Sequence, residues 1–235
     1  MHFAPLYPVL HWILKPLFPD CLWEGFGNSK TIALTFDDGP HPQHTLPLLE
    51  VLARYQITAN FFWLGVCVNR NPTIAREIYQ QGHWVGLHGY DHRIFPTLAV
   101  DELKDQLEKT QLAIARACDL DLSYVQQHIR DVRPPVGVFT PQTLIYLQQW
   151  HYRPVMWSVV PEDWVRPGVA IATQRVLEQT QNGSLIVLHD GYHGGEDVAA
   201  IASTVIPTLL DLGYEFVTID QLWQQRQLTE ASKNI

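Results

Sequence analysis

The sequence predicts an α/β fold in which about seven parallel strands form a single distorted (β/α) barrel. Short apolar or β-branched runs alternate along the chain with segments whose apolar residues recur at helical spacing. Such alternation implies parallel strand pairing through right-handed crossovers. The 235 residues, 46% hydrophobic and 17% charged with no low-complexity segment, suit one domain of this size.

The expected strands are short, and most end in turn residues or polar side chains. The first, T-I-A-L-T-F, stops abruptly at Asp37 and Asp38 and is followed by the turn Gly39-Pro40. The second, T-A-N-F-F-W-L, is β-branched and aromatic, as strands tend to be. The full set is 31–36, 58–64, 84–88, 129–133, 153–160, 185–188 and 215–219.

Helices are expected between these strands. The second of them carries Pro72 in its first turn and is followed by Gly82, which are common start and stop signals. The longest has an apolar inner stripe that includes Leu103, Leu107 and Ile114. The expected helices span 45–55, 72–81, 100–117, 141–150, 169–181 and 198–212.

The chain divides into an apolar, proline-rich arm (1–29), the barrel (30–226) and a short tail (227–235). Prolines interrupt residues 1–23 and exclude a continuous membrane-spanning helix, and no clear secretory signal is present. We expect the arm to pack on the barrel; the alternative is a peripheral membrane contact through its aromatic residues. A cytoplasmic or membrane-peripheral location is therefore favoured.

The charge and the cysteines exclude several classes of partner. A formal net charge of -8 provides no basic footprint for nucleic acid. The three cysteines are widely spaced and include no Cys-x-x-Cys pair, so neither a disulfide framework nor a thiolate zinc site is indicated. The oligomeric state is not encoded in any feature of the sequence.

Side chains that can do chemistry follow several of the expected strands. In a parallel barrel the carboxyl ends of the strands meet at one mouth, so these side chains should lie together. Asp38, His88 and His92 would form a site of two histidines and one carboxylate, which leaves coordination positions open for water and substrate. The other strand ends contribute Asp37, Arg133, Asp163, Trp164, His189 and Asp190. Taken singly, these residues are also compatible with solvated turns, salt bridges and ordinary packing.

Five ordered motifs resemble those of the polysaccharide deacetylases of carbohydrate esterase family 4, the NodB homology domain. The resemblance covers about residues 30–222. Between the first two motifs, T-L-P-L-L-E-V-L and N-F-F-W-L-G also match the family. The motifs are T-F-D-D-G-P at 35–40, G-H-W-V-G-L-H-G-Y-D-H at 82–92, R-P-P-V-G at 133–137, W-S-V-V-P-E-D-W at 157–164 and L-I-V-L-H-D at 185–190.

The resemblance implies a metal-dependent hydrolase that removes an N-acetyl or similar acyl group from an amino sugar. By position, Asp37 would be the general base, and Asp38, His88 and His92 would hold a divalent metal, most often zinc or cobalt. His189 would be the acid that protonates the leaving amine.

Further residues acquire roles from the same resemblance. Arg133 would pair with Asp37 and keep it ionised. Trp157 and Trp164 would shape the groove wall and support His189. The residues expected at the substrate or the oxyanion are Val136, through its backbone N–H, with Trp157, Asp163 and Trp164.

Three positions depart from the family pattern. Gly89 stands where a Ser or Thr commonly follows the first ligand histidine, so a loop-stabilising hydrogen bond should be missing. Val136 replaces an aromatic residue and changes the groove wall. Val160 replaces the aspartate that orients the acid histidine, so His189 should be a weaker cation at neutral pH unless Asp163, Asp190 or Glu196 compensates.

Two alternatives to a deacetylase of glycans, oligosaccharides or glycolipid precursors stay open. One is a related amide hydrolase acting on a non-chitin substrate. The other is a catalytically weak relative that binds glycans without efficient proton transfer.

Overall fold

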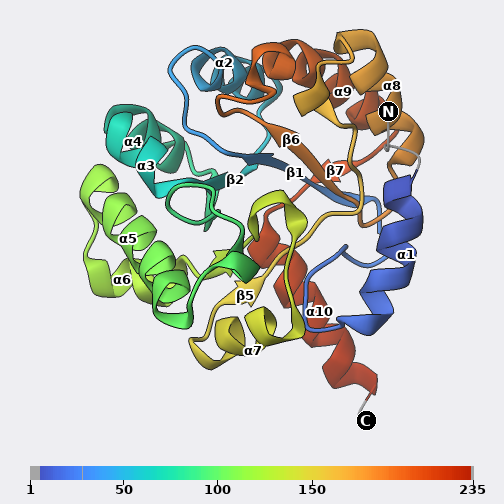
Figure 1. Ribbon diagram of the computed structural model, residues 1–235. Coiled ribbons are helices and arrows are strands. Elements are labelled where there is room, and N and C mark those ends of the chain that lie inside the picture. Colours follow the sequence, from blue (N-terminus) through green and yellow to red (C-terminus); the bar gives the residue numbers. More distant parts are fainter. Residues whose placement is uncertain (1–5, 28, 234–235) are drawn as a thin grey trace.

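The computed structural model describes residues 6–27 and 29–233. Residues 1–5 of the arm and 234–235 of the tail, for which the sequence also made predictions, lie outside the described residues. Parallel strands form one curled sheet in the order β5-β4-β3-β2-β1-β6, and β7 pairs with β1 (Figure 1). The strands are β1 (Thr31–Asp37), β2 (Asn60–Trp63), β3 (Trp84–Leu87), β4 (Asp131–Val132), β5 (Arg153–Pro154), β6 (Leu185–His189) and β7 (Glu215–Phe216). The predicted fold class is confirmed.

The fifth strand is much shorter than predicted, because the segment after Pro154 goes on to pair with other parts of the chain. After β5, Val155 bridges to Leu22 of the arm, and Val159 bridges to Ile186 of β6. Leu22 donates to the carbonyl of Pro154 at 2.9 Å and accepts from the amide of Met156 at 2.8 Å. The segment 155–160 thus runs from the β5 edge of the sheet to the β6 edge, with part of the arm paired beside it.

Helices surround the curled sheet (Figure 1). The six predicted helices are present with ends within two residues of those expected. Prolines do not prevent α1, because Pro8 lies in its first turn and Pro16 next to its end. The helices are α1 (Tyr7–Leu17), α2 (Thr45–Tyr55), α3 (Gly65–Arg70), α4 (Pro72–Gln80), α5 (Val100–Cys118), α6 (Leu122–His128), α7 (Pro141–Gln149), α8 (Val169–Gln179), α9 (Val198–Asp211) and α10 (Ile219–Lys233).

Strand β1 is buried at all of its positions and has two different faces. Ile32, Leu34 and Phe36 belong to the main core between sheet and helices, whereas Ala33 belongs to a separate cluster with Phe62 of β2. Because side chains alternate along a strand, Thr35 and Asp37 lie on the same face as Ala33. This register places Asp37 at the inner, carboxyl end of the strand.

A buried carboxylate ties the amino-terminal ends of three strands together. Asp131, the first residue of β4, is fully buried and accepts hydrogen bonds from the indoles of Trp84 and Trp223, each at 2.9 Å. The guanidinium of Arg153 donates to both of its oxygens at 2.9 and 2.8 Å. These contacts link β3, β4, β5 and α10 at the end of the barrel opposite the predicted mouth.

We predict that Asp131→Ala lowers the free energy of unfolding by about 3 to 5 kcal/mol, because it leaves Arg153 and two indoles without their buried acceptor. Urea denaturation measures the change. The matched control is Asp220→Ala, which removes the other, partly exposed carboxylate near Arg153 and should cost about 1 kcal/mol or less. Equal small losses for the two variants would contradict the account.

Helix α1 presents an apolar surface to solvent. Tyr7, His11 and Leu14 face the barrel, where they contact Trp157, Trp23 and the cluster around Met156. On its other sides the large apolar side chains are exposed, and Trp12 reaches 77% exposure. These side chains are Val9, Leu10, Trp12, Ile13 and Leu17, and Leu6 just before the helix is exposed as well. Within the described residues, no helix has the length and apolarity needed to cross a membrane.

Peripheral membrane contact, which the sequence left as an alternative for the arm, stays untested, and the exposed side chains of α1 allow a direct test. We expect the protein to co-sediment with phosphatidylcholine vesicles, and Trp12→Ser combined with Leu17→Ser to reduce the bound fraction severalfold, because these side chains would enter the interface. The control is Leu212→Ser, an exposed apolar residue after α9. Sedimentation that is absent, or equal in all variants, would refute the contact.

Candidate active site

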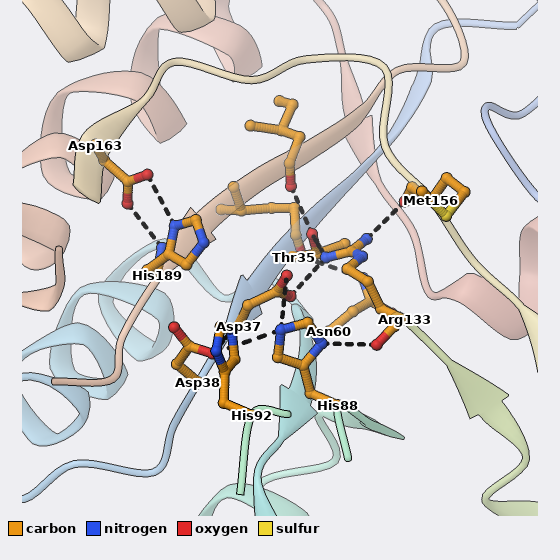
Figure 2. Close-up of polar contacts among 12 residues, drawn as sticks. Thr35, Asp37, Asp38, Asn60, His88, His92, Arg133, Met156, Asp163 and His189 are labelled. Atoms are coloured by element: carbon orange, nitrogen blue, oxygen red, sulfur yellow. Dashed lines mark hydrogen bonds and ion pairs between the residues drawn. The ribbon is translucent and has the colours of Figure 1, made fainter. Parts of the chain in front are cut away.

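The two adjacent carboxylates after β1 reach the same site because the chain bends between them. Adjacent residues on an extended strand point to opposite sides, but Asp38 leaves the strand with φ 73°. Nε2 of His88 consequently lies 3.9 Å from Oδ2 of Asp37 and 3.5 Å from Oδ1 of Asp38. Figure 2 shows both acids beside the imidazole of His88.

Asp38, His88 and His92 form a group suited to a metal ion. Their donor atoms lie within 4.8 Å of one another, and Nε2 of His92 is 3.4 Å from Oδ1 of Asp38. That Oδ1 is buried and has no hydrogen-bond partner, which is costly unless a cation completes its environment. The residues therefore fit a divalent metal with open coordination positions.

His88 is held in the tautomer that a metal ligand needs. Its Nδ1 lies 2.7 Å from the carbonyl oxygen of Arg133. A carbonyl can only accept, so Nδ1 carries the hydrogen and Nε2 keeps its lone pair for the site. Burial lowers the pKa of His88 despite the nearby charges of Asp37 and Asp38, which favours the neutral ring.

Arg133 fixes Asp37 from inside the barrel. Nη1 of Arg133 donates to Oδ1 of Asp37 at 2.6 Å and to Oγ1 of Thr35 at 2.8 Å, and Nη2 donates to the carbonyl of Met156 at 2.8 Å. The guanidinium also lies 4.1 Å from the ring centre of Phe62. One carboxylate oxygen of Asp37 is thus occupied, while the other faces His88 (Figure 2).

The loop that carries His92 is held by polar side chains that sequence reasoning missed. Oγ1 of Thr110 donates to the carbonyl of Gly89 at 2.9 Å, and Oε1 of Gln106 accepts from the amides of Tyr90 and Asp91 at 2.8 and 3.2 Å. Gly89 has no side chain that could donate the hydrogen bond expected to be missing, and Thr110 and Gln106 of α5 hold the loop by other bonds. The sequence signal that could have predicted this support is the presence of two polar residues, Gln106 and Thr110, on the inward-facing stripe of α5.

His189 has the carboxylate partner that Val160 does not supply. Asp163 accepts hydrogen bonds from the backbone amide of His189 at 2.7 Å and from its Nδ1 at 2.9 Å. Burial lowers the pKa of His189, but the charge of Asp163 and its hydrogen bond, aided by Asp38 and Asp37, outweigh burial and raise this pKa to about 10. Of the three acids that could compensate for Val160, Asp163 is the one that pairs with His189, so the weakening expected without compensation does not occur.

The sequence predicts Asp163 at the substrate or the oxyanion, but the structure places its side chain elsewhere. Its side chain is fully buried against His189, so it acts on that imidazole and does not line an open groove. Trp164 packs edge-on against His189 with ring centres 5.1 Å apart, as expected. Trp157 packs instead against Tyr7 and Trp23, so its predicted support of His189 is not direct.

Val136 occupies a strained turn after β4. It adopts φ 52° and ψ 15°, a left-handed conformation that β-branched residues seldom adopt, and its side chain is 57% exposed. Gly137 follows in the same region with φ 67° and lies directly against the indole of Trp157. Strain of this kind is held in place by the surrounding structure and is common at functional sites.

Comparisons with known proteins show the family. The polysaccharide deacetylase family model matches residues 25–155. The chain is 30% identical over 202 residues to a peptidoglycan-N-acetylglucosamine deacetylase of Bacillus cereus, covering 85% of this chain and 91% of that one. It is 32% identical over 206 residues to a chitooligosaccharide deacetylase of Bradyrhizobium sp., covering 83% and 91%. The chain therefore belongs to the polysaccharide deacetylase family, as its motifs predict.

Solved structures agree with this fold. A crystal structure of a peptidoglycan N-acetylglucosamine deacetylase, in complex with an N-hydroxybenzamide, superposes with TM-score 0.81 at 28% identity, covering 87% of this chain and 93% of that chain. A second structure, with TM-score 0.75 and 28% identity over 85% of this chain and 67% of the other, is described as a pseudoenzyme of carbohydrate esterase family 4 from Bacillus anthracis. Proteins with this fold thus include one named a deacetylase and one described as a pseudoenzyme.

We predict that Asp163→Asn lowers the pKa of His189 well below about 10, because it removes the largest of the charges that oppose burial. The raised pKa means that the pair stabilises the fold fully below pH 6.5, and that this contribution is lost as pH rises through about 10. Titration of the imidazole by NMR measures the shift. Glu196→Gln, at an exposed acid paired with Arg166, is the control. An unshifted pKa in Asp163→Asn would refute the pairing.

Proposed function

We propose that this protein is a metal-dependent hydrolase that removes the N-acetyl group from an amino sugar in a glycan, oligosaccharide or glycolipid precursor. The observation that carries the proposal is the convergence of one group of three residues and two ion pairs on one mouth. Asp38 faces the two histidines, Asp37 is paired with Arg133, and His189 is paired with Asp163. Membership of the polysaccharide deacetylase family, and relatives named for acting on peptidoglycan N-acetylglucosamine and chitooligosaccharides, support it.

Asp38, His88 and His92 would hold the ion, for which zinc is the best candidate and cobalt an alternative. A divalent ion bound there supplies a Lewis acid that makes water more acidic and polarises the amide carbonyl. The protein contributes a neutral His88 with its lone pair turned inward and a carboxylate oxygen with no other partner.

Asp37 would act as the general base. Arg133 occupies its Oδ1, so Oδ2 is the oxygen that can take a proton from the attacking water. Because the guanidinium is fully buried and bonded also to Thr35 and Met156, Asp37 has little freedom to turn away. Positioning of this kind is what proton transfer requires.

His189 would act as the general acid toward the leaving amine. Its Nδ1 is engaged by Asp163, so the proton must be delivered from Nε2. The raised pKa keeps the imidazole protonated at neutral pH, and Trp164 limits its rotation. An exposed Val136 turn beside the site is consistent with a backbone N–H that stabilises the developing oxyanion.

A catalytically weak glycan-binding relative is the second candidate, and the pseudoenzyme structure is the observation that favours it. The absence of an aspartate at Val160 no longer argues for it, because Asp163 takes that place. A related amide hydrolase with a non-chitin substrate is separated from both by a panel of acylated substrates.

We predict that the protein releases acetate from chitooligosaccharides, that a chelator abolishes release and that added zinc or cobalt restores it. Asp37→Asn should reduce kcat by about 10²-fold to 10⁴-fold while one metal per chain is retained, because it removes proton transfer and leaves the three ligands intact. Acetate assay and metal analysis give the two readouts.

The control for that experiment is Asp101→Asn, an exposed acid in the first turn of α5, which should behave as wild type. Full activity in Asp37→Asn would sink the assignment of the base. Acetate release that persists in the stripped protein would sink the metal dependence, and a metal-loaded protein inactive on every acylated sugar would favour the glycan-binding candidate.

A further inference from the structure

Four aromatic rings lie on the two loops that leave β1 and β6 at the mouth of the barrel. His41 and His44 stack with ring centres 4.1 Å apart, the ring of Tyr192 is 6.4 Å from that of His41, and His193 is 5.1 Å from Tyr192. We call these four residues the aromatic ridge. Strands β1 and β6 are hydrogen-bonded neighbours, so their following loops emerge side by side (Figure 1).

The aromatic ridge is attached directly to a proposed metal ligand. Gly191, which precedes Tyr192, packs so closely on Asp38 that an added Cβ would lie 2.3 Å from the Cβ of Asp38. Nδ1 of His44 hydrogen-bonds the carbonyl of Gly191 at 2.7 Å and so joins the two loops. The two loops of the aromatic ridge are thus joined to each other, and one of them packs directly against the proposed metal ligand Asp38.

The rings are accessible and have no part in the proposed chemistry. Tyr192 is 72% exposed and His193 is also exposed. Burial, together with the neighbouring His44, lowers the pKa of His41, so this ring is uncharged at neutral pH. Among the described residues, the histidines of the ridge do not gather a third metal-binding group, which argues against a second metal site.

Such a surface suits a sugar ring. A pyranose has an apolar face of C–H groups that packs on aromatic rings, while its hydroxyls can bond to imidazole nitrogens and a phenol. A glycan whose acetamido group lies at Asp38 must continue across a neighbouring part of the mouth. The aromatic ridge is the aromatic surface next to that point.

We propose that the aromatic ridge binds a sugar residue adjacent to the one that loses its acetyl group, and thereby makes the enzyme prefer oligosaccharides over a disaccharide. The inference rests on the proposed function and specifies the substrate of that same site. Tyr192 is the most exposed contributor and therefore the residue whose removal should matter most.

The test compares kcat/KM for acetate release from chitobiose and chitopentaose. In Tyr192→Ala the ratio of pentamer to dimer should fall about tenfold, because the longer chain loses its stacking partner. Tyr192→Phe keeps the ring and should keep the ratio. The control is Tyr124→Ala, which removes a partly exposed tyrosine stacked on His128 of α6 and should leave the ratio unchanged.

A ratio that is unchanged in Tyr192→Ala, or that falls equally in Tyr192→Phe, would overturn the subsite. Calorimetry of chitopentaose binding to metal-loaded Asp37→Asn distinguishes failure of the subsite from failure of the proposed function. If the wild type releases no acetate, the subsite is still supported when Tyr192→Ala weakens chitopentaose binding about tenfold. The subsite is refuted when Tyr192→Ala leaves this binding unchanged, or when chitopentaose does not bind.

Discussion

The ion pair between Arg133 and Asp37 is the interaction on which the site depends. Arg133 is fully buried, and a buried charge is tolerated only when it is paired and hydrogen-bonded. Its guanidinium joins β1, through Thr35 and Asp37, to the segment that carries Met156, while its backbone carbonyl orients His88. One residue therefore fixes both the proposed base and one proposed metal ligand.

The mouth separates two proton-handling groups by giving each a different partner. The guanidinium of Arg133 is paired with Asp37 on one side, whereas the carboxylate of Asp163 raises the pKa of His189 on the other. Neighbouring strands supply this arrangement, because Asp37 ends β1 and His189 ends β6 directly opposite it in register. Environment, not residue type alone, assigns which group accepts a proton and which donates one.

Much of the fold and the grouping of the proposed metal ligands could be predicted from the sequence, because both depend on local sequence patterns. Strand-helix alternation predicted the sheet and the six helices, and strand ends predicted the grouping of Asp38, His88 and His92. The sequence offered Asp163, Asp190 and Glu196 as partners of His189 but could not choose among them, since Asp163 reaches His189 only after the chain crosses from β5 to β6. The support of the His92 loop by Gln106 likewise depends on how α5 packs.

The central claim is that Asp38, His88 and His92 bind one catalytic metal ion beside Asp37. Crystals of zinc-loaded protein, with anomalous differences collected at the zinc edge, test it most directly. The account predicts a single strong peak between Oδ1 of Asp38 and the Nε2 atoms of His88 and His92. A peak at another set of residues, or none in protein that binds zinc stoichiometrically in solution, would contradict it.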